Sequence, residues 1–270
     1  MNAKSLQLAV YLLAQIMLTA CDMIESHPYD VHISGEKHLT DKNKGLIESE
    51  LKGRHSFVFA MISDTQRGFD ETADVVQAIN RRQDIDFVVH GGDMTEYGTS
   101  RELEWTRDIL NRLNVPYISV IGNHDCIATG LEAYRTIFGD LNYSFIAGDI
   151  KFLCLNTNAL EFDRSVDVPD FCFLDNELSM TPPEVSGTIV LMHAGPFSEQ
   201  FNNNIAREFH ERLKCFPDLR FCLYGHGHKV KASAPFGDGI MYYECASIRK
   251  RSFLLFTVRE GDYDYEVIEF

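Results

Sequence analysis

Five apolar runs in this sequence end in side chains that can bind a metal ion. They end at Asp64 and Gln66, at Gly91-Gly92-Asp93, at Gly122-Asn123-His124-Asp125, at His193, and at Gly225-His226-Gly227-His228. One such ending is typical of a turn that follows a strand. Because open α/β sheets place their ligands at the carboxyl ends of the strands, five such endings predict a single site.

The side chains at these endings determine which chemistry the site can perform. Apart from His124 and Asp125, these endings supply two carboxylates, three histidines and two amides, without a cysteine. Oxygen and imidazole ligands suit manganese, iron or zinc in a reactive site better than they suit a thiolate-bound structural zinc. Seven ligands exceed what one ion needs. The set therefore predicts a two-metal site, which clamps the attacking and leaving oxygens in phosphoryl transfer.

The elements that must position these residues alternate between strands and helices. Apolar runs predict strands over 57–62, 86–90, 116–122, 188–193 and 220–228, and a hairpin over 143–156 that turns at Gly148-Asp149. Helical spacing predicts helices over 40–51, 69–80, 100–113, 131–138 and 205–214. The segments 239–246, 252–260 and 263–270 predict strands joined by short turns, as in an antiparallel edge. This rhythm indicates an α/β fold.

The N-terminus predicts export. Lys4 precedes an apolar segment over 6–19, which is shorter than the roughly 20 residues that a spanning helix needs. The following Leu18-Thr19-Ala20-Cys21 resembles the lipobox of bacterial lipoproteins, in which the cysteine becomes the lipidated first residue. We expect a signal peptide over 1–20, a tether with a short helix over 21–53, and one catalytic domain over 54–270. The protein would then be a periplasmic or surface lipoprotein, held at a bacterial membrane by a lipid on Cys21. The alternative is an ordinary buried or amphipathic helix.

The composition limits the binding partners. The formal charge is −15, from 40 Asp plus Glu against 25 Lys plus Arg, which disfavours general nucleic-acid binding. An anionic substrate needs a local positive charge, which a bound metal can supply. Apart from Cys21, six cysteines remain, and none forms a CxxC motif. Cysteine chemistry is therefore not expected to carry the function.

The ordered series D-x-Q, G-G-D, G-N-H-D, H and G-H-G-H resembles the calcineurin-like metallophosphoesterase superfamily. The resemblance implies a four-layer α/β/β/α sandwich with two mixed sheets and a dinuclear centre between their edges. It also implies hydrolysis of a small phosphomonoester or phosphodiester by a water or hydroxide activated at that centre. Carried over by position, the family's ligands for the first ion are Asp64, Gln66 and His228. Those for the second ion are Asn123, His193 and His226. The residue that bridges the two ions is Asp93.

His124 resembles the family's histidine that is not a ligand. That histidine protonates the leaving oxygen or stabilises the phosphoryl charge. In phosphoprotein phosphatases an aspartate three residues after the bridging one orients it, and Glu96 holds that position here. Asp125 is the competing candidate for the same role.

The sequence departs from the family pattern at two positions. Gln66 stands where histidine is commonest, which should tilt the first ion towards manganese, iron or magnesium. Tyr97 replaces the phosphate-binding arginine of the Ser/Thr protein phosphatases, which disfavours that activity. Arg67 either contacts a substrate phosphate or is solvated.

Two other functions compete with a small-molecule phosphoesterase. One is a nuclease of the same superfamily, which the acidic composition disfavours. The other is a catalytically silent, metal-bound interaction scaffold, which would have no need for a proton donor such as His124. Substrate choice is expected to depend on the rim segments 156–172 and 201–204.

Overall fold

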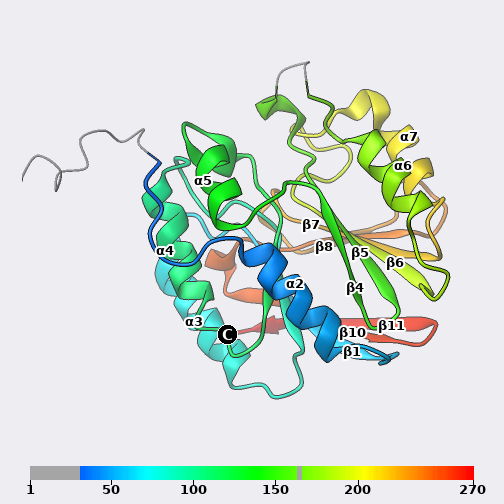
Figure 1. Ribbon diagram of the computed structural model, residues 1–270, viewed down its shortest axis with the longest axis horizontal. Coiled ribbons are helices and arrows are strands. Elements are labelled where there is room, and N and C mark those ends of the chain that lie inside the picture. Colours follow the sequence, from blue (N-terminus) through cyan, green and yellow to red (C-terminus); the bar gives the residue numbers. More distant parts are fainter. Residues whose placement is uncertain (1–30, 163–165) are drawn as a thin grey trace, which may run out of the picture. The chain divides into compact units, whose positions relative to one another are not determined.

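The computed structural model describes residues 31–162 and 166–270, which fold into two mixed sheets with helices outside them (Figure 1). The first sheet has the order β11-β10-β1-β2-β3, with β11 Asp262–Glu269, β10 Ser252–Arg259, β1 Phe57–Ile62, β2 Phe87–His90 and β3 Tyr117–Ser119. The second has the order β4-β5-β6-β7-β9-β8, with β4 Tyr143–Ala147, β5 Ile150–Leu155, β6 Gly187–Met192, β7 Leu219–Tyr224, β9 Met241–Glu244 and β8 Lys231–Ser233.

Helices cover the outer faces of the sheets. Figure 1 shows α3 and α4 beside the first sheet, and α6 and α7 beside the second. The α-helices of the described residues are α2 Leu39–Glu50, α3 Phe69–Asn80, α4 Ser100–Leu110, α5 Gly130–Ile137, α6 Phe171–Ser179 and α7 Ala206–Leu213. Cover on both faces explains why the central strands are apolar along their whole length. All six residues of β6, for example, are buried.

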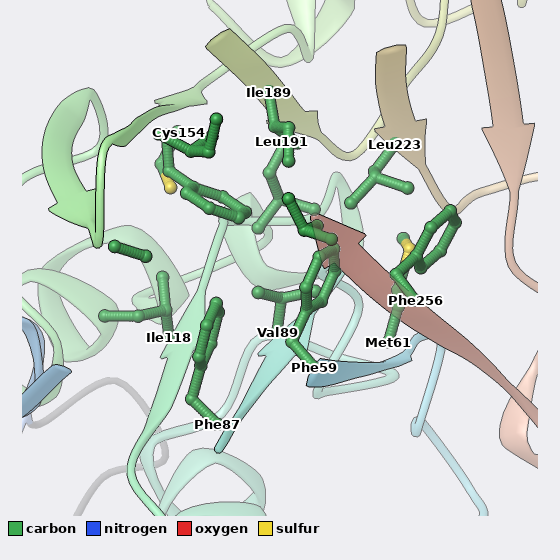
Figure 2. Packing of buried hydrophobic residues seen from close by; sticks show 14 of the residues in the cluster. Phe59, Met61, Phe87, Val89, Ile118, Cys154, Ile189, Leu191, Leu223 and Phe256 are labelled. Atoms are coloured by element: carbon green, nitrogen blue, oxygen red, sulfur yellow. The ribbon is translucent and has the colours of Figure 1, made fainter. Parts of the chain in front are cut away.

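The main core lies between the two sheets (Figure 2). The Phe59 ring of β1 stacks on Phe87 of β2 and on Phe256 of β10, with centroid separations of 5.3 and 5.1 Å. Leu191 and Leu223 face these rings from the second sheet. A further apolar cluster joins the second sheet to α6 and α7. The four-layer α/β/β/α sandwich with two mixed sheets is thus confirmed.

The C-terminal strands differ from the expected antiparallel edge. β9 lies in the second sheet and runs parallel to β7, whereas β10 and β11 form an antiparallel pair in the first sheet. A 3₁₀ helix over Ile248–Lys250 connects β9 to β10. The short strand β8 and helix α6 were not predicted.

The folded unit begins before residue 54. The Asn43 side chain of α2 donates a hydrogen bond to the carbonyl of Tyr117 (2.8 Å), and Ile47 and Leu51 belong to the core between the sheets. The predicted signal peptide and Cys21 lie outside the described residues, so export and lipidation stay predictions. Within residues 31–162 and 166–270, no helix is both long and apolar enough to cross a membrane.

Candidate metal centre

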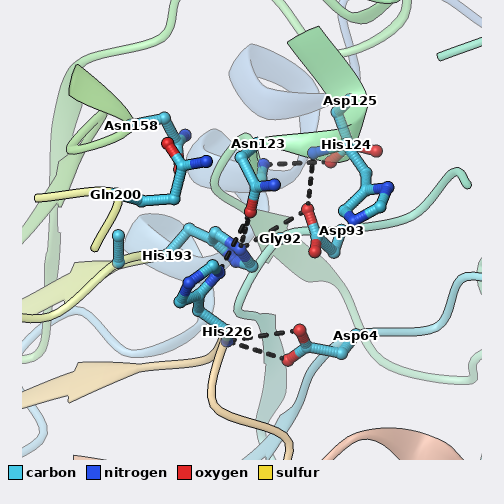
Figure 3. Close-up of polar contacts among 12 residues, drawn as sticks. Asp64, Gly92, Asp93, Asn123, His124, Asp125, Asn158, His193, Gln200 and His226 are labelled. Carbon is cyan, nitrogen blue, oxygen red and sulfur yellow. Dashed lines mark hydrogen bonds and ion pairs between the residues drawn. The ribbon is translucent and has the colours of Figure 1, made fainter. Parts of the chain in front are cut away.

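The loops after five strands meet at one end of the two sheets (Figure 3). The loops after β1, β2 and β3 carry Asp64, Asp93 and Asn123 from the first sheet. His193 and His226 follow β6 and β7 of the second sheet. The expected convergence of strand ends is therefore observed.

Glycines allow these loops to approach closely. A Cβ atom on Gly122 would lie 2.1 Å from the backbone nitrogen of Asp93. A Cβ atom on Gly92 would lie 2.7 Å from Nδ1 of His193, and Gly92 also has a φ of +92°. Any larger residue at either position would push the site apart.

Four of the predicted ligands adopt a left-handed backbone conformation. The φ angles are 53° at Asp64, 58° at Asp93, 69° at His226 and 58° at His228. Such conformations cost about 1–3 kcal/mol each in residues other than glycine and concentrate at functional sites. These conformations therefore lower the stability of the fold while they orient the four side chains, which is consistent with a functional site.

A first group of possible ligand atoms comes from Asp64, Asp93 and His228, whose atoms lie within 4.8 Å of one another. Asp64 is fully buried, and its Oδ1 lies 3.1 Å from Nε2 of His228. The backbone N–H of His226 donates to both Asp64 carboxylate oxygens at 3.2 Å. Asp64 thus holds the G-H-G-H loop in place and still faces the centre.

A second group comes from Asp93, His193 and His226, again within 4.8 Å. His193 donates its Nδ1–H to the carbonyl of Gly91 (2.7 Å), which turns Nε2 towards Oδ1 of Asn123 (3.0 Å). His226 contacts Glu199 through Nε2 (3.0 Å) and turns Nδ1 towards the same Asn123 oxygen (3.0 Å).

The contacts of these rings match those of metal-binding histidines. Such histidines donate one ring N–H to a carbonyl or carboxylate and present the other nitrogen to the metal. His193 and His226 therefore direct nitrogen lone pairs at the amide oxygen of Asn123. Facing acceptors repel one another unless a proton or a cation lies between them. The donor set therefore fits a bound cation.

The Gln66 side chain lies at the first group. Its Nε2 donates to Oδ2 of Asp93 (3.3 Å) and lies 3.5 Å from Nε2 of His228. Its Oε1 is buried and has no hydrogen-bond partner among the described residues. Exchanging the two ends of the amide would turn this oxygen towards Asp93, where a cation would satisfy it. Gln66 thus fits the role of an oxygen ligand.

Electrostatics favour positive charge in the centre. Burial alone would raise the pKa of Asp93, but the charge and hydrogen bond of His193 lower it overall. Burial would lower the pKa of His193, but the charges of Asp93 and Asp64 raise it overall. The buried carboxylates therefore stabilise a positive charge beside them, whether it is a proton or a metal ion.

His124 lies beside the ligand groups and belongs to neither of them. Its backbone N–H donates to Oδ1 of Asp93 (2.9 Å), and its ring contacts the backbone carbonyl of Glu96 through Nδ1 (2.9 Å). The Nε2 atom then remains for a substrate. This geometry suits the predicted proton donor.

Neither of the carboxylates expected to orient His124 makes a hydrogen bond to its ring among the described residues. The Glu96 carboxylate pairs with Arg67, so Glu96 contacts the ring through its main chain only. Asp125 is fully buried and accepts hydrogen bonds from the backbone N–H groups of Met94, Thr95 and Gly122 at 2.9–3.0 Å. Asp125 therefore ties the loop of Asp93 to the loop of Asn123.

Burial and the charge of Asp93 raise the pKa of Asp125 to about 7. A buried carboxylate so close to Asp93 is costly unless it is well hydrogen-bonded. The four donors at Asp125, which include the Thr95 hydroxyl (3.1 Å), offset that cost. Asp125 is thus the structural link between two ligand-bearing loops.

Sequence reasoning missed several contacts that support the centre. Glu199 contacts His226, and the Ser247 hydroxyl donates to the backbone carbonyl of Asp64 (3.0 Å). Neither residue belongs to a motif. His90 also supports the centre, because its ring accepts the backbone N–H of Gly92 (3.1 Å) and contacts the Thr65 hydroxyl (3.0 Å). Burial lowers the pKa of His90 to about 4, so this ring is neutral at pH 7.

Comparison with known proteins identifies the family. A sequence model described as calcineurin-like phosphoesterase matches residues 57–230, which include every predicted ligand. The chain belongs to the calcineurin-like phosphoesterase family. This phosphoesterase is 23% identical over 185 residues to a protein of Nostoc named 3′,5′-cyclic-nucleotide phosphodiesterase, a match that covers 64% of this chain and 69% of the relative.

Solved structures share the fold. A dimetal phosphatase from Danio rerio aligns with a TM-score of 0.62 and 15% identity over 79% of this chain and 96% of that one. A purple acid phosphatase from yellow lupin seeds aligns with a TM-score of 0.61 and 13% identity over 81% of this chain and 52% of that one. The inner membrane complex anchor of Plasmodium aligns with a TM-score of 0.58 and 14% identity over 80% and 85%. The phosphoesterase fold therefore occurs in proteins with different names and roles.

Proposed function

We propose that this phosphoesterase hydrolyses small phosphodiesters with two divalent ions, and that 3′,5′-cyclic nucleotides are the first substrates to test. The observation that carries the proposal is the pair of ligand groups that share Asp93, each with three residues whose ligand atoms lie within 4.8 Å. The preference for a diester is supported by the name of the Nostoc relative.

Each residue has a definite part in the proposed centre. Asp64, Gln66 and His228 would hold one ion, and the second ion would be held by Asn123, His193 and His226. Asp93 would bridge the two. Bound there, such ions lower the pKa of a water molecule and offset the negative charge on the phosphoryl oxygens.

The protein residues around the centre perform the remaining steps. The contact with the Glu96 carbonyl fixes the His124 ring, so that its Nε2 can give a proton to the leaving oxygen. Arg67, which pairs with Glu96, would contact a phosphoryl oxygen. Asp64, Asp93 and His193 are buried, so bulk water has little access to their side chains.

The proposal is tested by removing the metal with a chelator and adding back manganese, iron, zinc or magnesium singly. The substrates are p-nitrophenyl phosphate, bis(p-nitrophenyl) phosphate, 3′,5′-cyclic AMP, a sugar nucleotide, and single- and double-stranded DNA. We expect activity to disappear with the metal, to return with at least one ion, and to be higher on diesters than on monoesters. Cleavage of DNA in preference to the small diesters would favour the nuclease. Two bound ions without hydrolysis of any substrate would favour the scaffold.

Gln66→His should change the preferred metal without changing the fold. An imidazole nitrogen is a softer ligand than an amide oxygen and favours zinc over manganese. We expect the ratio of bound zinc to bound manganese after competitive loading to rise by about 10- to 100-fold. Substitution of a residue that hydrogen-bonds to a metal ligand already changes metal affinity by that factor. Elemental analysis of the loaded protein measures that ratio.

Gln77→His is the matched control, because Gln77 lies exposed on α3. It should load metals as the wild type does. An unchanged ratio in Gln66→His would show that Gln66 is not a ligand.

A further inference from the structure

A pocket of about 270 Å³ opens beside the metal centre and shares His226 with it. Its walls come from the loop after β6, the loop after β7, and strands β8 and β9. The lining residues that matter here are Phe197, Ser198, Lys229, Lys231 and Glu244. Because His226 borders both the centre and the pocket, an organic group attached to a phosphate at the centre can extend into the pocket.

Phe197 is 59% exposed at the wall of this pocket. One part of its ring packs on Phe236, with a centroid separation of 5.3 Å. Phe236 in turn stacks on the buried ring of His210 at 3.9 Å. The Phe197 ring is therefore held by packing contacts and presents a flat apolar face to the pocket.

The backbone at Phe197 is strained. The backbone N–H of Ser198 donates to the carbonyl of Gly195 (3.1 Å), which closes a turn with Pro196 and Phe197 at its centre. The φ of Phe197 is +73°, as in the position of a type II turn that glycine or asparagine usually fills. A bulky residue in this conformation is rare, and such residues cluster at functional sites.

Asn203 holds the strained residue in place. Its Oδ1 accepts the backbone N–H of Phe197 (2.7 Å), and its Nδ2 donates to the carbonyl of Ser198 (2.7 Å). These two bonds fix the turn from both sides. The exposed ring is thus kept at the pocket wall by dedicated contacts.

Polar groups of the pocket lack partners. Glu244 is 3% exposed, and its Oε2 accepts a hydrogen bond from the Tyr224 hydroxyl (3.1 Å), but its Oε1 has no partner among the described residues. The Ser198 hydroxyl has none in that part of the chain either. Lys229 and Lys231 balance the charges of Glu199 and Glu244 at the pocket wall. A flat apolar surface and hydrogen-bonding atoms without partners together suit the base and sugar of a nucleotide.

We propose that this pocket binds the nucleoside part of the substrate, with the base stacked on Phe197. This inference rests on the proposed function, because it names the organic group of the diester. Stacking on an aromatic side chain contributes about 1–3 kcal/mol per base, which corresponds to an affinity difference of about 5- to 150-fold. Phe197 would then determine specificity and would take no part in bond breaking.

The test compares AMP with ribose 5-phosphate, which carries the same phosphate and sugar but no base. Binding of each to manganese-loaded protein is measured by titration calorimetry. We expect the wild type to bind AMP about 5- to 150-fold more tightly than ribose 5-phosphate. Phe197→Asn, which suits the left-handed backbone and removes the ring, should abolish that difference and leave the affinity for ribose 5-phosphate unchanged. Phe197→Tyr should retain the preference.

Met180→Asn is the matched control, because Met180 is similarly exposed (65%) and lies outside the pocket. It should bind both ligands as the wild type does. Equal affinity of the wild type for the two ligands, no binding of either, or an unchanged preference in Phe197→Asn would overturn the inference. Because the assay measures binding, an active enzyme without base preference refutes only the pocket. A base preference without hydrolysis of the substrate panel refutes only the proposed function.

Discussion

Asp93→Ala is expected to abolish both metal binding and turnover while the protein remains folded. Asp93 belongs to both ligand groups, so its loss damages both ion sites at once. We expect kcat to fall by more than the roughly 10²- to 10³-fold that removal of a single electrostatic contact costs. Without metal the variant should stay folded, because relief of the repulsion between Asp93 and buried Asp125 offsets part of the lost pairing with His193.

Thermal unfolding with and without manganese separates these effects. A ligand that binds only the folded state stabilises it by about 2.7 kcal/mol at a free concentration of 100 times Kd. The wild type should show this gain and Asp93→Ala should not. Asp70→Ala, a change in the first turn of α3, is the control and should behave as the wild type does. Full activity in Asp93→Ala would refute the dinuclear account.

His124→Gln is expected to lower kcat by about 10²- to 10⁴-fold, the usual contribution of a positioned general acid. Metal content should stay at the wild-type level, because His124 is outside both ligand groups. The loss should be large for 3′,5′-cyclic AMP, whose leaving alkoxide needs a proton. It should be small for bis(p-nitrophenyl) phosphate, whose leaving phenolate is stable without one.

The control for this variant is His55→Gln, because the His55 side chain is exposed and pairs with Asp149 away from the centre. Kinetics of both variants on the two diesters give the comparison. An equal loss on both substrates would mean that His124 does not protonate the leaving group. It would then act by stabilising charge or by holding the loop.

The sequence predicted where the chemistry lies because the ligand-bearing segments follow strands buried on both faces. Such strands, including β1 and β6, appear as uninterrupted apolar runs, and the polar residue that ends each run marks the edge of a sheet. Local pattern was therefore sufficient for the series from Asp64 to His228. The assignment of these residues as ligands stays a prediction.

The sequence did not predict which sheet the last strands join. β9 and β10 are separated by a few residues, yet they belong to different sheets. The connection is fixed by tertiary contacts, among them the hydrogen bond from the Ile248 N–H to the Ser63 carbonyl (3.1 Å). Strand patterns alone carry no information about such a crossover.

The contacts that support the candidate site could not be predicted from the sequence either. Glu96 has the position expected for an orienting carboxylate, but its side chain pairs with Arg67 and only its carbonyl meets His124. The backbone strain at Phe197 could not be predicted either. The residue types of a turn can be read from the sequence, but a positive φ at one of them cannot. Both features depend on backbone geometry that residue types do not determine.

The central claim is that one shared aspartate joins two metal sites. Anomalous diffraction from a crystal of the manganese-loaded protein tests it most directly. We predict two anomalous peaks roughly 3.5–4 Å apart on either side of Asp93, the spacing of two-metal hydrolases. One peak should lie at Asp64 and His228, and the other at His193 and His226. A single peak at full manganese occupancy, or peaks away from Asp93, would contradict the account.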